Sequence, residues 1–187
     1  MTNPEITRKM NPIELIEKYY DNKSELYKIL FIHSSQVRDK ALEVAARHPD
    51  LGADTQFIAE ASMLHDIGIY LTNAPEIECF GKHEYIEHGY LGSDLLRREG
   101  FPNHALVCER HTGAGLTLDW ILEKELPLPH RDMFPVSIEE KIICYADKFF
   151  SKSKPDKELS VEKIIRKLGK YTEQQVEIFS KWHNEFS

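Results

Sequence analysis

Hydrophobic residues recur at three- and four-residue spacing along nearly the whole chain, which is the period of an α-helix. The longest run extends from Ser24 to about Arg47, and His33 lies on its apolar stripe. No segment shows the sustained alternation of apolar and polar residues that marks a half-buried strand. The pattern therefore predicts an all-α fold, a helical bundle.

Capping residues, prolines and glycines divide this pattern into shorter helices. Besides the long run, the helices predicted are Pro12 to Tyr20, Asp54 to a break at Gly68, Glu84 to Glu99, Pro102 to about His111, Thr117 to Glu125, Ile138 to about Ser151, and about Ser160 to Phe186. Gly68 is expected to end its helix in the left-handed conformation, and Gly169 can interrupt the last helix. The stretch from Tyr70 to Lys82 is predicted to be a loop.

Length and composition limit the class of protein. A chain of 187 residues predicts one domain, and a formal charge of −7 argues against binding a nucleic acid polymer. The three cysteines form no closely spaced pair, so neither a disulfide framework nor a zinc knuckle is expected. Residues 1–10 are polar without an apolar signal core, and no stretch is long enough to span a membrane. A cytoplasmic protein is therefore expected.

Nine histidines are the unusual feature of the composition, because histidine is the commonest metal ligand in proteins. Each candidate has an ordinary explanation when taken alone, such as a buried histidine bonded to a carbonyl group or a solvated residue at a helix end. Taken in chain order, however, the candidates fall on several predicted helices: His33, His65, Asp66, His88, His111 and Asp147. Helical bundles build metal sites from inward-facing side chains of neighbouring helices.

The order His, His-Asp, Asp resembles the signature of the HD-domain superfamily of metal-dependent phosphohydrolases. The string from His65 to Gly68 matches the subgroup named for H-D-I-G. The segment from His88 to Leu96 resembles the family's segment of His, Gly four residues later and then Leu, and Glu109-Arg110-His111 resembles its next histidine motif. The resemblance covers roughly residues 29–151. It implies an HD domain with a core of about residues 24–151, on which the C-terminal helices of residues 160–186 pack.

The resemblance also implies a ligand set and a reaction. One divalent metal ion would be held by His33, His65, Asp66 and Asp147, and Asp66 would bridge to a second ion. That second ion would also be held by His88 and His111, with Mn, Fe, Co, Ni or Zn as the candidate metals. The expected reaction is hydrolysis of a phosphoester or phosphoanhydride in a small, nucleotide-like substrate by attack of a metal-bound hydroxide, with Asp66 and His65 as catalytic residues.

The sequence alone leaves the phosphate-binding residues, the reaction class and the oligomeric state open. The candidates for binding the substrate's phosphate are Lys148, His83, Lys82 and Arg110, each of which is also explained as a surface residue. The same six ligands would suit an HD-type diiron oxygenase that acts on a small molecule, or a metal-binding module without turnover. The apolar face of the last helix can pack on the core or on a second subunit, which leaves a homodimer open.

Overall fold

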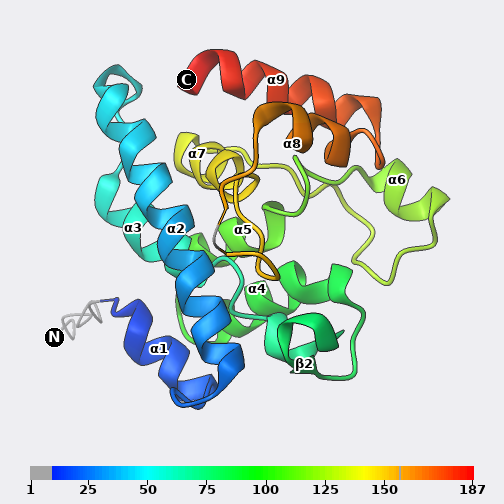
Figure 1. The fold of residues 1–187 in the computed structure, drawn as a ribbon. Coiled ribbons are helices and arrows are strands. Elements are labelled where there is room, and N and C mark those ends of the chain that lie inside the picture. The colour runs from blue at the N-terminus through cyan, green and yellow to red at the C-terminus, as the bar shows by residue number, and fades with distance from the viewer. Residues whose placement is uncertain (1–9, 156) are drawn as a thin grey trace, which may run out of the picture.

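Helices carry most of the fold, as the hydrophobic pattern predicts (Figure 1). The computed structural model describes residues 10–155 and 157–187, so most of the polar N-terminal stretch lies outside the described residues. The α-helices are α1 (Pro12–Tyr19), α2 (Glu25–Arg47), α3 (Thr55–Leu64), α4 (His88–Arg98), α5 (Pro102–Arg110), α6 (Leu118–Glu123), α7 (Ile138–Asp147), α8 (Val161–Leu168) and α9 (Glu173–Phe186). Short 3-10 helices cover Pro49–Leu51, Ile69–Leu71, Pro75–Ile77 and Tyr85–Glu87.

Side-chain caps explain where several helices begin. Asn11, Ser24, Asp54 and Thr172 each accept a hydrogen bond from a backbone N–H in the first turn of the helix that follows. These bonds satisfy N–H groups that have no partner inside the helix. Asn11, Ser24 and Asp54 also stand at the helix starts that the sequence predicts, whereas the start of α9 after Thr172 was not predicted.

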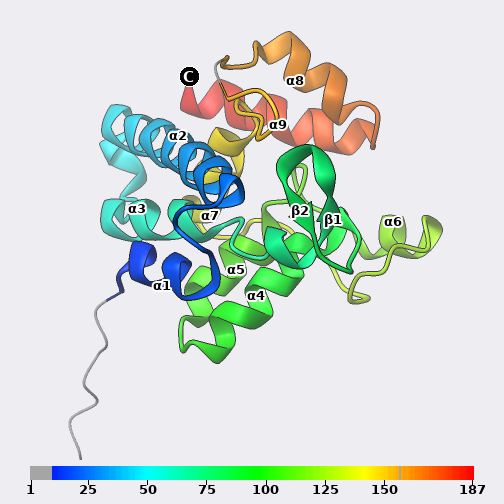
Figure 2. The same cartoon turned by 60° about the horizontal axis from the view of Figure 1, so that its bottom comes forward.

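Two local predictions need correction, and the interruption that Gly169 allowed is confirmed. The third helix ends at Leu64, and Gly68 has φ −83°, an ordinary right-handed conformation. The predicted loop contains a two-stranded antiparallel hairpin, β1 (Asn73–Ala74) and β2 (Cys79–Phe80), which Figure 2 shows beside the helices. The predicted last helix is two helices, α8 and α9, and the break follows Leu168 at Gly169, where the sequence allowed an interruption.

Two large apolar clusters fill the interior and meet along α2. One cluster includes Val37 of α2 and joins α3, α7, α8 and α9. The other includes Leu30 of α2 and joins α1, α3, α4, α5 and the β1–β2 hairpin. His33 lies between Leu30 and Val37 in the sequence and is 1% exposed. The seam between the clusters therefore contains a buried polar residue that neither cluster can satisfy by apolar packing.

The C-terminal helices lie against this core. Ile164 and Leu168 of α8 belong to the same apolar cluster as Phe179 and Trp182 of α9, and α9 contacts α7. In the described part of the chain, no helix combines the length and apolar character needed to cross a bilayer.

Candidate metal centre

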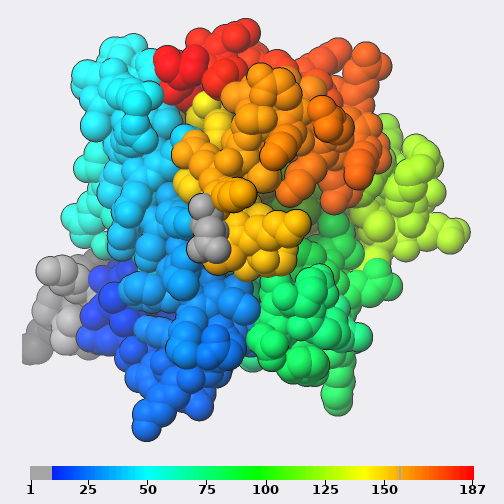
Figure 3. All heavy atoms as spheres, viewed as in Figure 1, coloured from blue at the N-terminus to red at the C-terminus, as the bar shows by residue number. Residues whose placement is uncertain are grey.

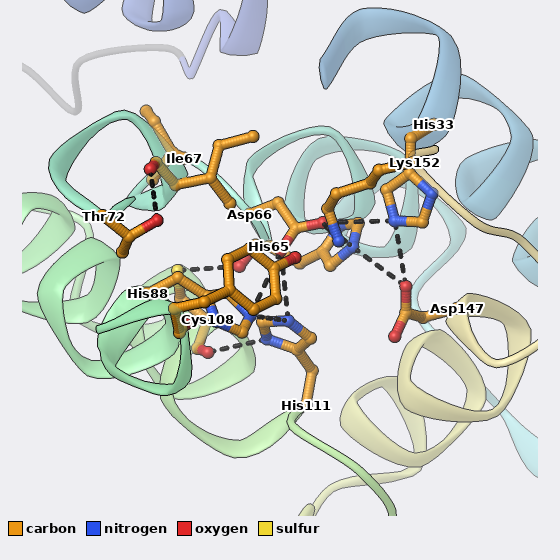
Figure 4. Close-up of polar contacts among 12 residues, drawn as sticks. His33, His65, Asp66, Ile67, Thr72, His88, Cys108, His111, Asp147 and Lys152 are labelled. Atoms are coloured by element: carbon orange, nitrogen blue, oxygen red, sulfur yellow. Dashed lines mark hydrogen bonds and ion pairs between the residues drawn. The ribbon is translucent and has the colours of Figure 1, made fainter. Parts of the chain in front are cut away.

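The six predicted ligands converge on one buried place, although they are spread from α2 to the end of α7 (Figure 4). All six are buried, and none is more than 9% exposed. Among the described residues, their side chains form two groups that share Asp66: His33, His65, Asp66 and Asp147 in the first group, and Asp66, His88 and His111 in the second group. The structure thus brings together the whole set that the sequence suggested.

The first group surrounds Oδ2 of Asp66. The Nε2 atoms of His33 and His65 lie 3.1 and 3.0 Å from this oxygen. Oδ1 of Asp147 lies 3.0 Å from Nε2 of His33 and 3.4 Å from Nε2 of His65. Two imidazole nitrogens and two carboxylate oxygens therefore face one another across a small gap.

The second group surrounds the other carboxylate oxygen, Oδ1 of Asp66. The Nε2 atoms of His88 and His111 each lie 3.4 Å from Oδ1 and 3.1 Å from each other. Asp66 therefore offers a different oxygen to each group. A carboxylate used in this way can bridge two cations.

Backbone carbonyl groups fix the tautomers of three of these histidines. Nδ1 of His65, His88 and His111 lies 2.7, 2.6 and 2.7 Å from the carbonyl oxygen of the residue three positions earlier. A carbonyl oxygen can only accept, so each Nδ1 carries a proton, and the neutral form of each ring presents its Nε2 lone pair. This is the arrangement in which a metal-binding histidine is oriented by its second ring nitrogen.

The donor set fits divalent metal ions. Nε2 of His65 and both carboxylate oxygens of Asp66 are buried and take part in no hydrogen bond of normal geometry. Ligand atoms about 2.1 Å from one ion lie roughly 3.0–3.4 Å apart in octahedral or tetrahedral geometry. The measured separations between Asp66 and its imidazole neighbours fall in this range. Mixed nitrogen and oxygen donors suit Mn, Fe, Co, Ni or Zn.

The turn that carries His65 and Asp66 is held from two sides. Sγ of Cys108 in α5 donates to the His65 carbonyl oxygen at 2.9 Å, and the Tyr20 hydroxyl donates to the Ile67 carbonyl oxygen at 2.7 Å. These bonds satisfy carbonyl groups that the end of α3 leaves without partners. The pair therefore lies on a fixed turn just beyond the helix, which lets two consecutive side chains reach the same buried site.

Two glycines allow α4 to approach this turn. A Cβ atom on Gly68 would lie 2.3 Å from the His88 carbonyl oxygen and 2.5 Å from the Gly92 backbone nitrogen. A Cβ on Gly92 would lie 2.4 Å from Sγ of Cys108. Gly92 therefore lies where α4 and α5 approach each other closely. The role of Gly68 is the same close contact rather than a left-handed cap.

Two lysines bring positive charge to the carboxylates. Nζ of Lys152 lies 2.6 Å from Oδ2 of Asp66, and Nζ of Lys148 lies 2.6 Å from Oδ2 of Asp147. Lys148 also donates to the His111 carbonyl oxygen at 2.9 Å. Burial would lower the pKa of each lysine, but the adjacent carboxylate raises it above its usual value. Both ammonium groups are therefore charged at neutral pH.

The electrostatics of the site favour ionised carboxylates. Burial would raise the pKa values of Asp66 and Asp147, yet His65 and Lys152 around Asp66 and Lys148 beside Asp147 hold them well below their usual range. Burial lowers the pKa of His88 to about 3, so this imidazole is neutral and can donate its lone pair at physiological pH. Burial would lower the pKa of His65 as well, but Asp66 and Asp147 raise it to about 9, so this ring gives up its Nε2 proton when it binds a metal ion. Deprotonated carboxylates and neutral imidazoles are the forms that bind metals.

A cavity of about 640 Å³ opens beside the site. Asp147, Lys148 and Lys152 form part of its wall, together with Tyr85, whose ring stacks on His88 with centroids 4.7 Å apart. The volume is that of a small-molecule pocket. In Figure 3 the segment of residues 150–155 lies at the surface between α2 and the hairpin region, above this part of the molecule.

The residues proposed for phosphate binding differ in position. Lys148 lines the cavity, whereas Lys82, His83 and Arg110 do not. Nδ1 of His83 lies 3.1 Å from Glu87, and Nη1 of Arg110 lies 3.1 Å from Glu140. A substrate role for these three residues stays a prediction, and in the structure His83 and Arg110 serve as partners of acidic side chains.

Sequence reasoning missed Lys152 and Tyr85. Lys152 follows α7 in a segment without helical pattern, so no spacing connects it to Asp66. Tyr85 lies three residues before His88, but any residue type supplies a carbonyl oxygen at that spacing, so nothing in the sequence indicated the role of its ring.

Comparisons with known proteins agree with this geometry. Residues 30–151 match the family model described as the HD domain. A protein of Methanocaldococcus jannaschii that is described only as uncharacterized is 34% identical over 142 residues, which cover 74% of this chain and 76% of that protein. No solved structure matches the chain.

Two longer relatives carry a functional name. The tRNA (cytidine(56)-2'-O)-methyltransferase of Thermoplasma volcanium is 30% identical over 162 residues, which cover 84% of this chain and 42% of that protein. The enzyme of the same name from Picrophilus torridus is 34% identical over 111 residues, which cover 58% of this chain and 29% of that protein. The chain thus spans less than half the length of these two relatives. On the evidence of the family match and the archaeal relative of similar length, the chain belongs to the HD domain family.

Proposed function

We propose that this protein is a metal-dependent phosphohydrolase that cleaves a phosphoester or phosphoanhydride bond in a small, nucleotide-like substrate. The HD domain and the buried cluster of histidines and aspartates support a metal-dependent hydrolase. The observation that carries the proposal is the pair His88 and His111. Their Nε2 atoms face each other at 3.1 Å beside Asp66, and a cation between these groups would satisfy the lone pairs that the carbonyl-oriented rings present there.

The ligand roles are proposed from the two groups. His33, His65, Asp66 and Asp147 would hold one ion, and Asp66, His88 and His111 would hold a second. When bound, two such cations would lower the pKa of a shared water and neutralise charge on phosphoryl oxygens. Asp66 and His65 are therefore the proposed catalytic residues.

The chain's own residues would orient the phosphate. The ammonium groups of Lys148 and Lys152 line the cavity and are charged, so they would attract and position an anionic group next to Asp66 and Asp147. Tyr85 packs against His88 and closes that side of the site to water.

A small molecule suits the cavity better than a polymer does. The cavity volume matches a small ligand, and the net charge of −7 opposes the binding of an RNA polymer. The names of the two longer relatives concern tRNA, but each name belongs to a protein more than twice the aligned length. A nucleotide remains the substrate class that we propose.

The test is phosphate release from a panel of nucleoside mono-, di- and polyphosphates and dinucleoside polyphosphates by protein purified with Mn²⁺ or Fe²⁺. We expect release from at least one compound, and loss of that activity with EDTA and in Asp66→Ala. Oxygen uptake with an iron spectrum and no phosphate release would instead indicate a diiron oxygenase. Bound metal without either activity would indicate a binding module.

A further inference from the structure

The cavity extends well beyond the metal centre. Figures 1 and 2 show that the C-terminal end of α8 lies toward α6 and away from α2, the helix that carries His33. Residues of that far side, Trp120 of α6 and Tyr171 after α8, also line the cavity, and their rings meet with centroids 6.0 Å apart. A phosphate beside Asp147 would fill only the near end of the cavity, so the rest of the substrate would occupy the far end.

The charge on the cavity wall is opposite to that of the protein. Four lysines line the cavity in a chain of net charge −7, against two acidic residues, one of which is the proposed metal ligand Asp147. Lys148 and Lys152 are accounted for by their ion pairs with the carboxylates of the centre. The other two lysines, Lys167 and Lys170, lie on the far side.

Lys167 and Lys170 lie close together at the C-terminal end of α8. The backbone N–H of Lys170 donates to the Lys167 carbonyl oxygen at 3.2 Å, in the turn that ends α8. Among the described residues, neither side chain forms an ion pair or a hydrogen bond with an acidic group. The helix dipole favours a basic residue at Lys167 but does not require it to face a cavity.

We propose that the substrate carries a second anionic group, distant from the group that reacts, and that Lys167 and Lys170 bind it. This inference rests on the proposed function, because it places the reacting phosphate beside Asp66 and Asp147. The apolar wall between the two ends, which includes Leu116, Phe150 and Ile164, would contact the uncharged middle of the molecule. A compound with a phosphate at each end has this chemistry.

Alkane phosphonates test the inference, because their carbon–phosphorus bonds are not hydrolysed. Isothermal titration calorimetry of the full chain loaded with Mn²⁺ would compare straight-chain bisphosphonates, from butane to octane with one phosphonate at each end, with monophosphonates of the same length. We expect one bisphosphonate length to bind about tenfold more tightly than its monophosphonate, since charge-assisted hydrogen bonds to a second anion have this magnitude. The preference should shrink at high salt.

The variant K167Q/K170Q should lose this preference while its affinity for the monophosphonate changes little. The matched control is K163Q/K181Q, which makes the same change in charge on α8 and α9 at exposed lysines outside the cavity. Thermal unfolding of both variants would verify folding. Equal affinity for both ligand types at every length, a preference that survives in K167Q/K170Q, or an equal loss in the control would overturn the inference.

Failure of this inference is distinguishable from failure of the proposed function. Phosphonate binding needs no turnover, so a protein without phosphatase activity can still show the preference. A working phosphatase without the preference would contradict only the second anionic subsite.

Discussion

Replacing Gly68 by alanine should damage one half of the metal centre and leave the other half intact. The added Cβ would lie 2.3 Å from the His88 carbonyl oxygen and 2.5 Å from the Gly92 nitrogen, whereas ordinary contacts begin at 3.4 Å. Both neighbours are backbone atoms of α4, so the start of that helix must move by about 1 Å. His88 would move with it.

The substitution should lower both the stability of the protein and its metal affinity. Overpacking of this kind costs about 1–3 kcal/mol, which lowers Tm by roughly 2–12 °C in a protein of this size. Metal–ligand distances tolerate only about 0.2 Å. A 1 Å displacement of His88 should therefore lower the metal affinity of the group of Asp66, His88 and His111 by about 10- to 100-fold. No ligand of the group that contains His33 and Asp147 lies on α4, so the displacement should weaken this group less.

Differential scanning calorimetry and metal titration of Gly68→Ala would measure the two effects. The matched control is Gly169→Ala, where the nearest atom to the new Cβ is the Ile165 carbonyl oxygen at 3.3 Å and φ is an ordinary −64°. A Gly68→Ala protein with the Tm and the metal stoichiometry of the wild type would refute the close-approach argument. An equal loss of metal affinity in both ligand groups would refute the division of the site into two metal-binding groups.

Other substitutions test separate parts of the account. Asp66→Ala should lose both metal ions and His88→Ala only one, as measured by mass spectrometric metal analysis; full occupancy in Asp66→Ala would reject the ligand assignment. Lys152→Gln should lower kcat/KM for phosphate release by about 10- to 100-fold with metal content unchanged, whereas Lys154→Gln, in the same segment but outside the cavity, should not. Burial lowers the pKa of His104, although Glu60 opposes the shift. The unfolded chain therefore binds a proton at this histidine at a higher pH than the folded chain does. As a result, the free energy of unfolding falls as the pH drops below the usual histidine pKa. His104→Gln should flatten this fall in urea unfolding from pH about 7 to 5, and an unchanged slope would contradict the burial argument.

The helices and the ligand set were predictable because their signals are local. Helical periodicity and caps such as Ser24 and Asp54 depend on neighbouring residues, and the His65-Asp66 pair and the order of the other ligands can be recognised in one dimension. The seam between two apolar clusters was not predictable in detail. Yet His33 on an apolar stripe already indicated a polar group inside the core.

Other features depend on contacts distant in sequence. The ion pair between Lys152 and Asp66 joins a segment after α7 to the turn after α3, and no spacing rule predicts it. The conformation of Gly68 was predicted wrongly because a glycine at a helix end commonly adopts the left-handed conformation, whereas here the approach of α4 requires the missing Cβ. The short β1–β2 hairpin has two-residue strands, which are too short to show alternation.

The central claim is that Asp66 bridges two cations in one buried centre. Anomalous diffraction from a crystal of protein loaded with Mn²⁺ or Fe²⁺, recorded at the absorption edge of the metal, measures this directly. The account predicts two anomalous peaks, one on the Oδ2 side of Asp66 next to His33, His65 and Asp147, and one on the Oδ1 side next to His88 and His111. Peaks elsewhere in the molecule, or none at Asp66 in protein shown to contain metal, would contradict it.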